Sequence, residues 1–380
     1  MRPSVCYVAS YDPDYSRNLD VIRALRAAGV RVEVVQPRNP RHFNGSVSSP
    51  LSLLRSATWL ATGTVLKTLD VGFRLLRCRA LVVGYFGNLD MLTLAPIAKC
   101  LGRPVIFNQL VTFTDTLVED RRIVDRRSVP AWLIGQLDRL ALGLADLVLA
   151  DTPENAEYVA RLSGIECSRL LVMPVGADET VFFPAKPEVE RPAGELDVLY
   201  YGKFIPLHGV EAIIRAAALL QAEHPGIHFE LIGTGQEHAD ARELAQDLNL
   251  ANIRWTDWLP YSGLGRRLRE ADVALGIFDG GGKAARVIPN KVHQALACGV
   301  PVVTRASPAV ARLLVDRQSA RLVPPDDPEA RAAALIELAS DPQHRREIGR
   351  AGRAVWESYA SNERLAALAR EALERVGVRV

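Results

Sequence analysis

The fold of this chain is decided by a stretch that reads Val287-Ile288-Pro289-Asn290-Lys291-Val292-His293-Gln294-Ala295-Leu296-Ala297-Cys298-Gly299-Val300-Pro301-Val302-Val303-Thr304. Apolar residues at three- and four-residue spacing predict a helix that begins at Pro289, and Gly299 is the usual left-handed cap. Pro301 to Thr304 then predicts a buried strand. A helix start with Lys291 just inside it offers N–H groups and positive charge, which predicts a phosphate site. The alternative is an ordinary crossover with Lys291 in solvent.

The composition describes an ordinary globular protein. At 380 residues the chain exceeds what one hydrophobic core usually serves, so two domains are expected. Hydrophobic residues make up 48% and charged residues 24%, which argues against disorder. A net charge of +2 gives no indication of nucleic-acid binding.

The cysteines and the apolar runs indicate the cellular compartment of the protein. The five cysteines are widely spaced and form no CxxC pair, so neither a disulfide framework nor a zinc site is predicted. The apolar run Val5 to Ala9 is too short for a signal peptide, and no apolar run is long enough to span a bilayer. We therefore expect a cytoplasmic protein that is neither secreted nor membrane-spanning.

Strand-like apolar runs alternate with helical patterns in two series. The first occupies roughly residues 5–174 and the second roughly residues 198–356, with a proline-rich, charged segment at 183–194 between them. Such alternation predicts an α/β protein with two parallel, doubly wound sheets, each covered on both faces. Ligands of such sheets bind beyond the carboxyl ends of the strands, so the cleft between the two domains is the expected site.

Three segments of the second series are expected at that carboxyl edge. They are Gly202-Lys203-Phe204, the glycine loop Asp279-Gly280-Gly281-Gly282-Lys283, and Asn290-Lys291. Glycines allow the backbone to approach a ligand, and lysines act as point charges on phosphoryl oxygens. The alternative for Gly202-Lys203 is a mere βα turn. Gly233-Thr234-Gly235 lacks the rest of a dinucleotide fingerprint and is interpreted as structural.

The chain resembles the retaining glycosyltransferases of family 4, also called group 1, which have the GT-B fold. Two segments carry the resemblance most clearly, Val198 to Phe204 with His208-Gly209-Val210, and Ile288 to Thr304. A weaker match is Ala145 to Thr152. The resemblance implies two Rossmann-like domains that face each other across a cleft: an acceptor-binding domain at 1–183, a linker at 184–197, a donor-binding domain at 198–358, and a C-terminal helix at 359–380 that packs back on the first domain.

The resemblance also implies roles for individual residues. The donor diphosphate would be bound by Gly202, Lys203, His208, Arg286, Asn290 and Lys291. At 208 the family usually has lysine, and at 286 and 294 it has a pair of glutamates, where this chain has histidine, arginine and glutamine. Gln294 can still hydrogen-bond ribose hydroxyls, whereas Arg286 accepts nothing and would bind phosphate instead. The nucleobase pocket would lie near Thr256-Asp257-Trp258, although aromatic side chains there also suit a core.

The missing glutamates leave the catalytic carboxylate open. Asp279 and Asp115 are the candidates, with Asn108 and Asp120 as further polar groups, and Gly280, Gly281, Gly282 and Lys283 would form the loop around the sugar. For the acids, a capping or solvated carboxylate is the commoner role. Because no DxD pair ends a donor-domain strand, we expect neither a metal nor any other cofactor besides the nucleotide-sugar co-substrate.

The expected function is therefore a hexosyltransferase of polysaccharide biosynthesis, which moves a sugar from a nucleotide-diphosphate sugar to a glycan or lipid-linked acceptor, with retention and without a metal. The alternatives are a sugar-nucleotide epimerase on a similar fold and a nucleotide-sugar-binding protein that lost catalysis. Lys67, Arg74 and Arg77 share one helical face in the segment 51–79. Either this face is simply solvated, or it makes a peripheral contact with the anionic inner face of a membrane.

Overall fold

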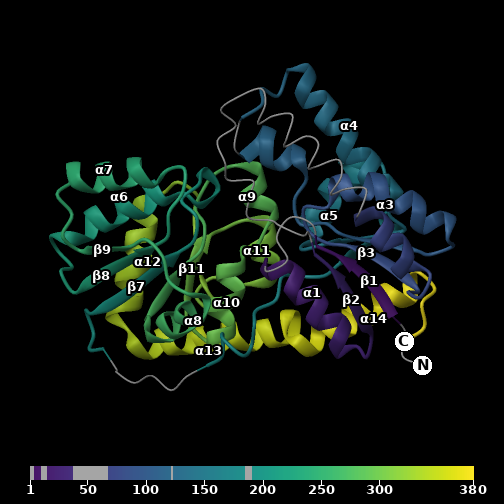
Figure 1. Cartoon of the computed structure of the whole chain (residues 1–380). Helices are drawn as coiled ribbons and strands as arrows, with labels where there is room; N and C mark the ends of the chain where they lie inside the picture. The colour runs from purple at the N-terminus through teal and green to yellow at the C-terminus, as the bar shows by residue number, and fades with distance from the viewer. Residues whose placement is uncertain (1–3, 10–14, 37–66, 121–122, 185–190) are drawn as a thin grey trace. The chain divides into compact units, whose positions relative to one another are not determined.

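The structure, a computed structural model, describes residues 4–9, 15–36, 67–120, 123–184 and 191–380 (Figure 1). The chain divides into two compact units. Unit 1 comprises Met1–Pro174 together with Asn362–Val380, and unit 2 comprises Val175–Ser361.

Unit 1 is built on a parallel sheet of six strands in the order β2-β1-β3-β4-β5-β6. The strands are β1 (Ser4–Val8), β2 (Arg31–Val35), β3 (Ala80–Val83), β4 (Val105–Asn108), β5 (Leu147–Ala150) and β6 (Leu170–Val172). Four of them, β1 and β3 to β5, are buried along almost their whole length, which explains their continuous apolar sequences. The predicted doubly wound sheet is confirmed.

Helices cover both faces of this sheet. On one face pack α1 (Ser16–Ala27) and α14 (Asn362–Arg375). On the other face pack helical residues 67–75 and the helices α3 (Asn88–Cys100), α4 (Val129–Leu144) and α5 (Pro153–Ser163). A π-helix, η2 (Thr114–Asp120), follows β4, and a short 3-10 turn, η3 (Cys167–Arg169), precedes β6. Residues 51–66 of the helical segment predicted at 51–79 lie outside the described residues.

Unit 2 repeats the design with a second parallel sheet of six strands, in the order β12-β11-β10-β7-β8-β9. The strands are β7 (Leu196–Tyr201), β8 (Ile227–Ile232), β9 (Ile253–Thr256), β10 (Val273–Leu275), β11 (Val302–Arg305) and β12 (Arg321–Val323). Strand order reverses between β7 and β10, which both lie at the centre of the sheet. Ligands of open α/β sheets bind outside the carboxyl ends of strands at such a reversal.

The helices of unit 2 again form two layers. One face carries α6 (Val210–Gln221), α7 (His238–Asp247) and α12 (Pro328–Ser340). The other carries α8 (Tyr261–Glu270), α10 (Asn290–Cys298), α11 (Pro308–Leu313) and α13 (Pro342–Ala360). The short helices η4 (Pro206–His208) and α9 (Gly282–Arg286) follow β7 and β10. Figure 1 shows α12 and α13 crossing the unit in yellow-green.

The unit boundaries differ from those expected from sequence. Unit 2 begins at Val175 rather than after 183, because Ala177 and Phe182 pack into the core beside α8 and α10. The predicted linker at 184–197 contains residues 185–190, which lie outside the described residues, and its last two residues already belong to β7. The C-terminal segment joins unit 1 from Asn362, where α14 packs against α1.

The helix at the centre of the deciding stretch begins one residue later than predicted. Pro289 is the N-cap of α10 and has an extended conformation with ψ of 153°, so Asn290 is the first helical residue. Gly299 adopts the predicted left-handed cap with φ of 71°. The first turn of α10 lies at the carboxyl edge of the sheet, and Lys291 is its second residue.

Candidate functional site

A buried lysine lies at the carboxyl edge of the unit 2 sheet. Lys291 is 6% exposed, and its Nζ lies 4.1 Å from the centre of the ring of Tyr200, the next-to-last residue of β7. The same Nζ lies 3.4 Å from Nδ1 of His208. The alternative of a solvated Lys291 is therefore wrong, because α10 places its ammonium against Tyr200 and His208, at the turn that follows β7.

Gly202 makes room for this ammonium. Its φ of +143° is accessible mainly to glycine, and a Cβ atom there would lie 2.9 Å from Nζ of Lys291. Burial lowers the pKa of Lys291 well below its usual value. An anion that binds next to this lysine would stabilise its charged form.

His208 holds the turn that carries Lys203. Its Nδ1 donates to the carbonyl oxygen of Lys203, and the Tyr200 hydroxyl lies 2.9 Å from the same nitrogen. The Lys203 side chain is exposed. The segments Gly202-Lys203, His208 and Lys291 thus come together as predicted for a diphosphate site, and Asn290 precedes Lys291 as the first residue of α10. Their binding role stays a prediction.

Gln294 lies one turn further along α10 and is 6% exposed. Its amide oxygen accepts a hydrogen bond of 2.8 Å from the Tyr201 hydroxyl. The oxygen that the ribose interpretation requires therefore already accepts one hydrogen bond within the protein, and its second lone pair and the NH₂ group are the parts of Gln294 that a nucleotide could use.

The glycine loop follows β10 and leads into α9. The carboxylate of Asp279 is half-buried and accepts a hydrogen bond of 2.7 Å from the backbone N–H of Gly281. Gly280 and Gly282 are exposed, and Lys283 and Arg286 lie on α9. Asp279 thus stabilises the loop that contains it. This is the capping role that the sequence offered as the alternative to a catalytic one.

Arg305, which sequence reasoning missed, fixes this loop. It ends β11, is 5% exposed, and its Nη1 donates to the carbonyl oxygens of Asp279 and, at 3.3 Å, of Gly281. Burial lowers the Arg305 pKa, although the nearby carboxylates of Asp279 and Asp326 act in the opposite direction. The sequence offered one signal for this role. Arg305 ends β11, the strand that pairs with β10, so its side chain lies near the loop that follows β10.

Two candidate residues of unit 1, Asp115 and Asn108, are buried. Asp115 lies at the start of η2 and is 2% exposed. Asn108 is fully buried: its Oδ1 accepts 2.8 Å from Nε of Arg17, and its Nδ2 donates 3.0 Å to the Tyr7 hydroxyl. The expectation that Asn108 faces a reacting sugar is wrong, because its amide is used inside unit 1. The side chain of Asp120 lies outside the described residues.

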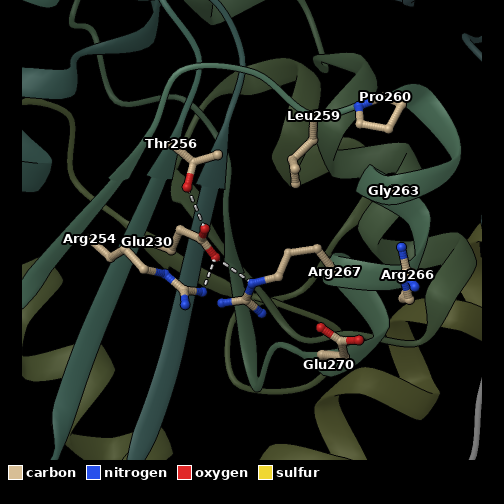
Figure 2. A pocket seen from close by; sticks show the side chains of 9 residues that line it. All are labelled: Glu230, Arg254, Thr256, Leu259, Pro260, Gly263, Arg266, Arg267 and Glu270. Atoms are coloured by element: carbon tan, nitrogen blue, oxygen red, sulfur yellow. Dashed lines mark hydrogen bonds and ion pairs between the residues drawn. The ribbon is translucent and has the colours of Figure 1, made fainter.

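Thr256 belongs to an ion-pair network at the end of β9, and its predicted role in nucleotide binding stays a prediction. Its hydroxyl donates 2.8 Å to Glu230, which also accepts 2.6 Å from Arg254 and a short bond from Arg267 (Figure 2). Burial opposes ionisation of Glu230, but these donors outweigh it and lower the Glu230 pKa. Trp258 is 74% exposed, so it is not a core residue.

The four side chains of the network, Glu230, Arg254, Thr256 and Arg267, line a hollow of about 300 Å³ between β8, β9 and α8 (Figure 2). The hollow contains none of the residues predicted to bind the diphosphate. We therefore place the candidate diphosphate site at Gly202, His208 and Lys291. Thr256, which was predicted to bind the nucleotide, lines the hollow.

The predicted basic face of unit 1 is largely neutralised. Lys67 forms a short ion pair with Asp90, and Arg74 pairs with Asp70 at 2.9 Å. Arg77 lies over the exposed Phe73 ring at 5.3 Å. A membrane contact through Lys67, Arg74 and Arg77 is therefore not supported, since acids within the unit already pair with two of the three cations.

The described ranges show neither a metal cluster nor a membrane-spanning helix. Within them, no group of three or more His, Cys, Asp or Glu side chains is arranged to hold a metal ion. Among the helices described, none is both long and apolar enough to cross a membrane.

Comparison with solved structures supports the fold. HepE of Anabaena, solved with UDP and glucose, matches with a TM-score of 0.69 at 14% identity and covers 97% of this chain and 99% of its own. Sucrose-phosphate synthase of Thermosynechococcus elongatus matches with a TM-score of 0.70 at 19% identity, over 96% and 97% of the two chains. The predicted pair of doubly wound, Rossmann-like units is thus also the architecture of known GT-B proteins.

Comparison of sequences finds similar enzymes. A D-inositol 3-phosphate glycosyltransferase of Kribbella flavida is 29% identical over 58% of this chain and 54% of its own length. A GDP-mannose-dependent mannosyltransferase of Corynebacterium glutamicum is 28% identical over 50% and 52%. The chain spans about half the length of these curated relatives. The profile described as "Glycosyl transferases group 1" matches residues 183–355, which contain the whole Lys291 site, so this part of the chain is similar to the group 1 glycosyltransferases.

Proposed function

We propose that this chain transfers a sugar from a nucleotide-diphosphate sugar to a glycan or lipid-linked acceptor, with retention of configuration and without a metal ion. The observation that carries the proposal is the buried Lys291 ammonium beneath Gly202 and next to His208, at the carboxyl edge of a doubly wound sheet. The group 1 relatives are named as glycosyltransferases, and related structures were solved with UDP or UDP-glucose.

The proposed chemistry is the departure of a nucleoside diphosphate. The bond between the anomeric carbon and the diphosphate oxygen breaks, the diphosphate keeps the electron pair, and an acceptor hydroxyl bonds to the carbon and loses its proton. Charge therefore develops on the leaving group. Lys291, Lys203 and the first turn of α10 supply positive charge to it without a bound cation, with Arg286 as a further cation on α9.

The roles of the remaining residues follow from their positions. Gln294 contributes its NH₂ group and the second lone pair of its oxygen to donor binding, because the Tyr201 hydroxyl uses only one of the two lone pairs. Asp279, held at its own loop by Gly281 and close to Arg305, is the unit 2 carboxylate that we propose faces the sugar. Asp115 is the unit 1 candidate. We propose that the reaction takes place in the cytoplasm, where nucleotide sugars are made.

The direct test is acceptor-dependent release of free nucleoside diphosphate in the presence of EDTA. Purified protein is incubated with UDP-sugars and GDP-sugars in turn, together with extracted glycan or lipid-linked acceptors. The proposal expects release for at least one donor only when an acceptor is present. An epimerase would convert the donor without an acceptor, and a binding protein would bind the donor without releasing diphosphate. Activity that EDTA abolishes and Mg²⁺ or Mn²⁺ restores would contradict the metal-free mechanism.

A further inference from the structure

The glycine loop after β10 leaves room for two carboxylates. A Cβ atom on Gly281 would lie 2.5 Å from Oδ2 of Asp279, and a Cβ atom on Gly280 would collide with Oδ2 of Asp326. Only glycine at these two positions allows both oxygens to lie so close to the loop backbone. Asp279 and Asp326 are far apart in the chain, yet their carboxylates flank the same two glycines.

Sequence reasoning missed Asp326, which follows β12 and precedes α12. It is exposed, and its φ of +52° belongs to the left-handed region that few residues with a side chain adopt. Its backbone N–H donates 3.2 Å to the carbonyl oxygen of Phe278, the residue before Asp279. An unusual conformation of this kind persists only where the surrounding structure determines it, so the fold places this carboxylate beside the glycine loop.

The same backbone connects the glycine loop to the candidate diphosphate site. The N–H of Phe278 donates 3.2 Å to the carbonyl oxygen of His208, and a Cβ atom on Gly209 would lie 2.8 Å from the backbone nitrogen of Asp279. His208 in turn lies next to the Lys291 ammonium. In a nucleotide sugar the sugar is bonded directly to the diphosphate. A donor whose diphosphate binds at Lys291 therefore has its sugar within reach of this loop.

The Asp326 carboxylate forms no bond within the described part of the chain. It accepts no hydrogen bond there and pairs with no cation at contact distance. Arg305 and Arg331 are buried nearby, where Asp326 favours their charged forms. The Nε of Arg305 is buried and likewise has no hydrogen-bond partner among the described residues. Both oxygens of Asp326 therefore remain available to a ligand.

The chemistry of the two carboxylates limits what they can bind. Ionised carboxylates accept hydrogen bonds and donate none, so a ligand of Asp279 and Asp326 must supply donors. A phosphate group offers acceptor oxygens, whereas neighbouring hydroxyl groups of a sugar supply one donor each. Hydrogen bonds to charged acceptors are among the stronger ones. A divalent cation is the other ligand that suits carboxylates, but the buried Arg305 cation near both acids disfavours a second positive charge.

We propose that Asp326, together with Asp279, recognises neighbouring hydroxyl groups of the donor sugar. This inference rests on the proposed function, and it assigns to Asp326 the choice of sugar and not the breaking of the bond to the diphosphate. The donor is then a nucleotide sugar whose sugar presents adjacent free hydroxyls to unit 2. Because Asp326 comes from the loop after β12, outside the segments that hold the diphosphate, its effect should be separable from diphosphate binding.

The test compares each nucleotide sugar with the nucleoside diphosphate that it contains. Calorimetric titrations in EDTA use UDP, GDP, UDP-glucose, UDP-galactose, UDP-N-acetylglucosamine and GDP-mannose against wild type, Asp326→Asn and Asp326→Gly. For the nucleotide sugar that wild type binds most tightly, both variants should lose affinity by about tenfold, the worth of one hydrogen bond to a charged group, while affinity for the diphosphate changes by less than about twofold. Asparagine and glycine adopt a φ near +52° readily, so both variants should fold.

Two controls separate this effect from general changes of charge and backbone. Asp247→Asn removes an exposed carboxylate of α7, and Asn249→Gly changes a residue whose φ is also +52°. Neither control should alter the affinity for the diphosphate or for the nucleotide sugar.

Several results would overturn the proposal. Equal losses for the nucleotide sugar and the diphosphate in Asp326→Asn would show an effect on the whole site. Unchanged affinities in Asp326→Asn, or a wild type that binds a diphosphate but none of the nucleotide sugars, would show that Asp326 contacts no sugar. A preference for the nucleotide sugar that requires Mg²⁺ would show a cation between the carboxylates. Absence of any nucleotide binding to wild type is a distinct result, which would contradict the proposed function and this inference with it.

Discussion

The ammonium nitrogen of Lys291 lies 2.9 Å from the point that a Cβ atom on Gly202 would occupy. A methyl group there must displace the lysine, because the Tyr200 ring and His208 lie against the same ammonium. We predict that Gly202→Ala weakens nucleoside diphosphate binding by about tenfold, the worth of one hydrogen bond to a charged group.

Backbone strain alone would also follow from Gly202→Ala, so a matched variant is needed. Gly164→Ala places the same methyl group at another glycine with positive φ, +73°, where nothing lies within 4 Å. Both variants should lower the melting temperature, but only Gly202→Ala should lower nucleotide affinity in calorimetric titration. Equal affinity in the two variants would show that Gly202 does not act through Lys291.

Lys291 should take up a proton when a diphosphate binds. Burial lowers its pKa in the free protein, and an adjacent anion favours the charged form and raises that pKa. Affinity should therefore be constant below the lower pKa and fall as pH rises through it. Titration calorimetry in buffers of different ionisation enthalpy, from about pH 7 to 10, measures the uptake. The same uptake in Lys291→Met would assign the proton to another group.

Arg305 should be a positioning residue for the glycine loop. Arg305→Met removes the donor that holds the carbonyls of Asp279 and Gly281, so the turnover number should fall by up to about a hundredfold while KM changes little. The control is Arg345→Met, since Arg345 is equally buried and donates 3.0 Å to the carbonyl of Leu338, outside the loop. It should cost stability and leave turnover unchanged. Comparable turnover losses in the two variants would point to a general effect on folding.

The Glu230 network should make unit 2 sensitive to acid. Since the folded-state pKa of Glu230 is lowered, its contribution is fully present above the unfolded value of about 4.3 and is lost as pH falls through the folded value. Arg267→Met leaves Glu230 buried without its main partner and should destabilise the protein by about 3–5 kcal/mol in urea unfolding. Glu230→Gln/Arg267→Met should recover much of this loss. No recovery would mean that Arg267 acts mainly through Asp197, which it also contacts at 2.7 Å.

The sequence predicted the two sheets well because their strands carry their own signal. Continuous apolar runs such as Val105 to Asn108 read as buried strands, and Gly299 marked the end of α10 correctly. The meeting of Gly202, His208 and Lys291 was also predictable, since each follows a strand or starts a helix at one sheet edge.

Side-chain partners were not predictable in the same way. Nothing in the sequence shows that the Gln294 oxygen is occupied by Tyr201 or that Asn108 is bound by Arg17, because these contacts depend on packing between distant elements. The prediction of a basic face on unit 1 was not supported for the same reason. The acid that pairs with Lys67 is Asp90, which lies on the next helix along the chain. Local charge counts do not include such partners.

The central claim is that the Lys291 site binds the diphosphate of the donor without a metal ion. Its most direct measurement is calorimetric titration of UDP, GDP and ADP in EDTA against wild type, Lys203→Ala and Lys291→Ala, with Lys99→Ala, an exposed lysine of unit 1, as control. We predict that at least one nucleotide binds wild type and the control, and that each of the first two variants loses roughly 1.5–3 kcal/mol of binding free energy. Wild-type affinity in both Lys203→Ala and Lys291→Ala would contradict the account.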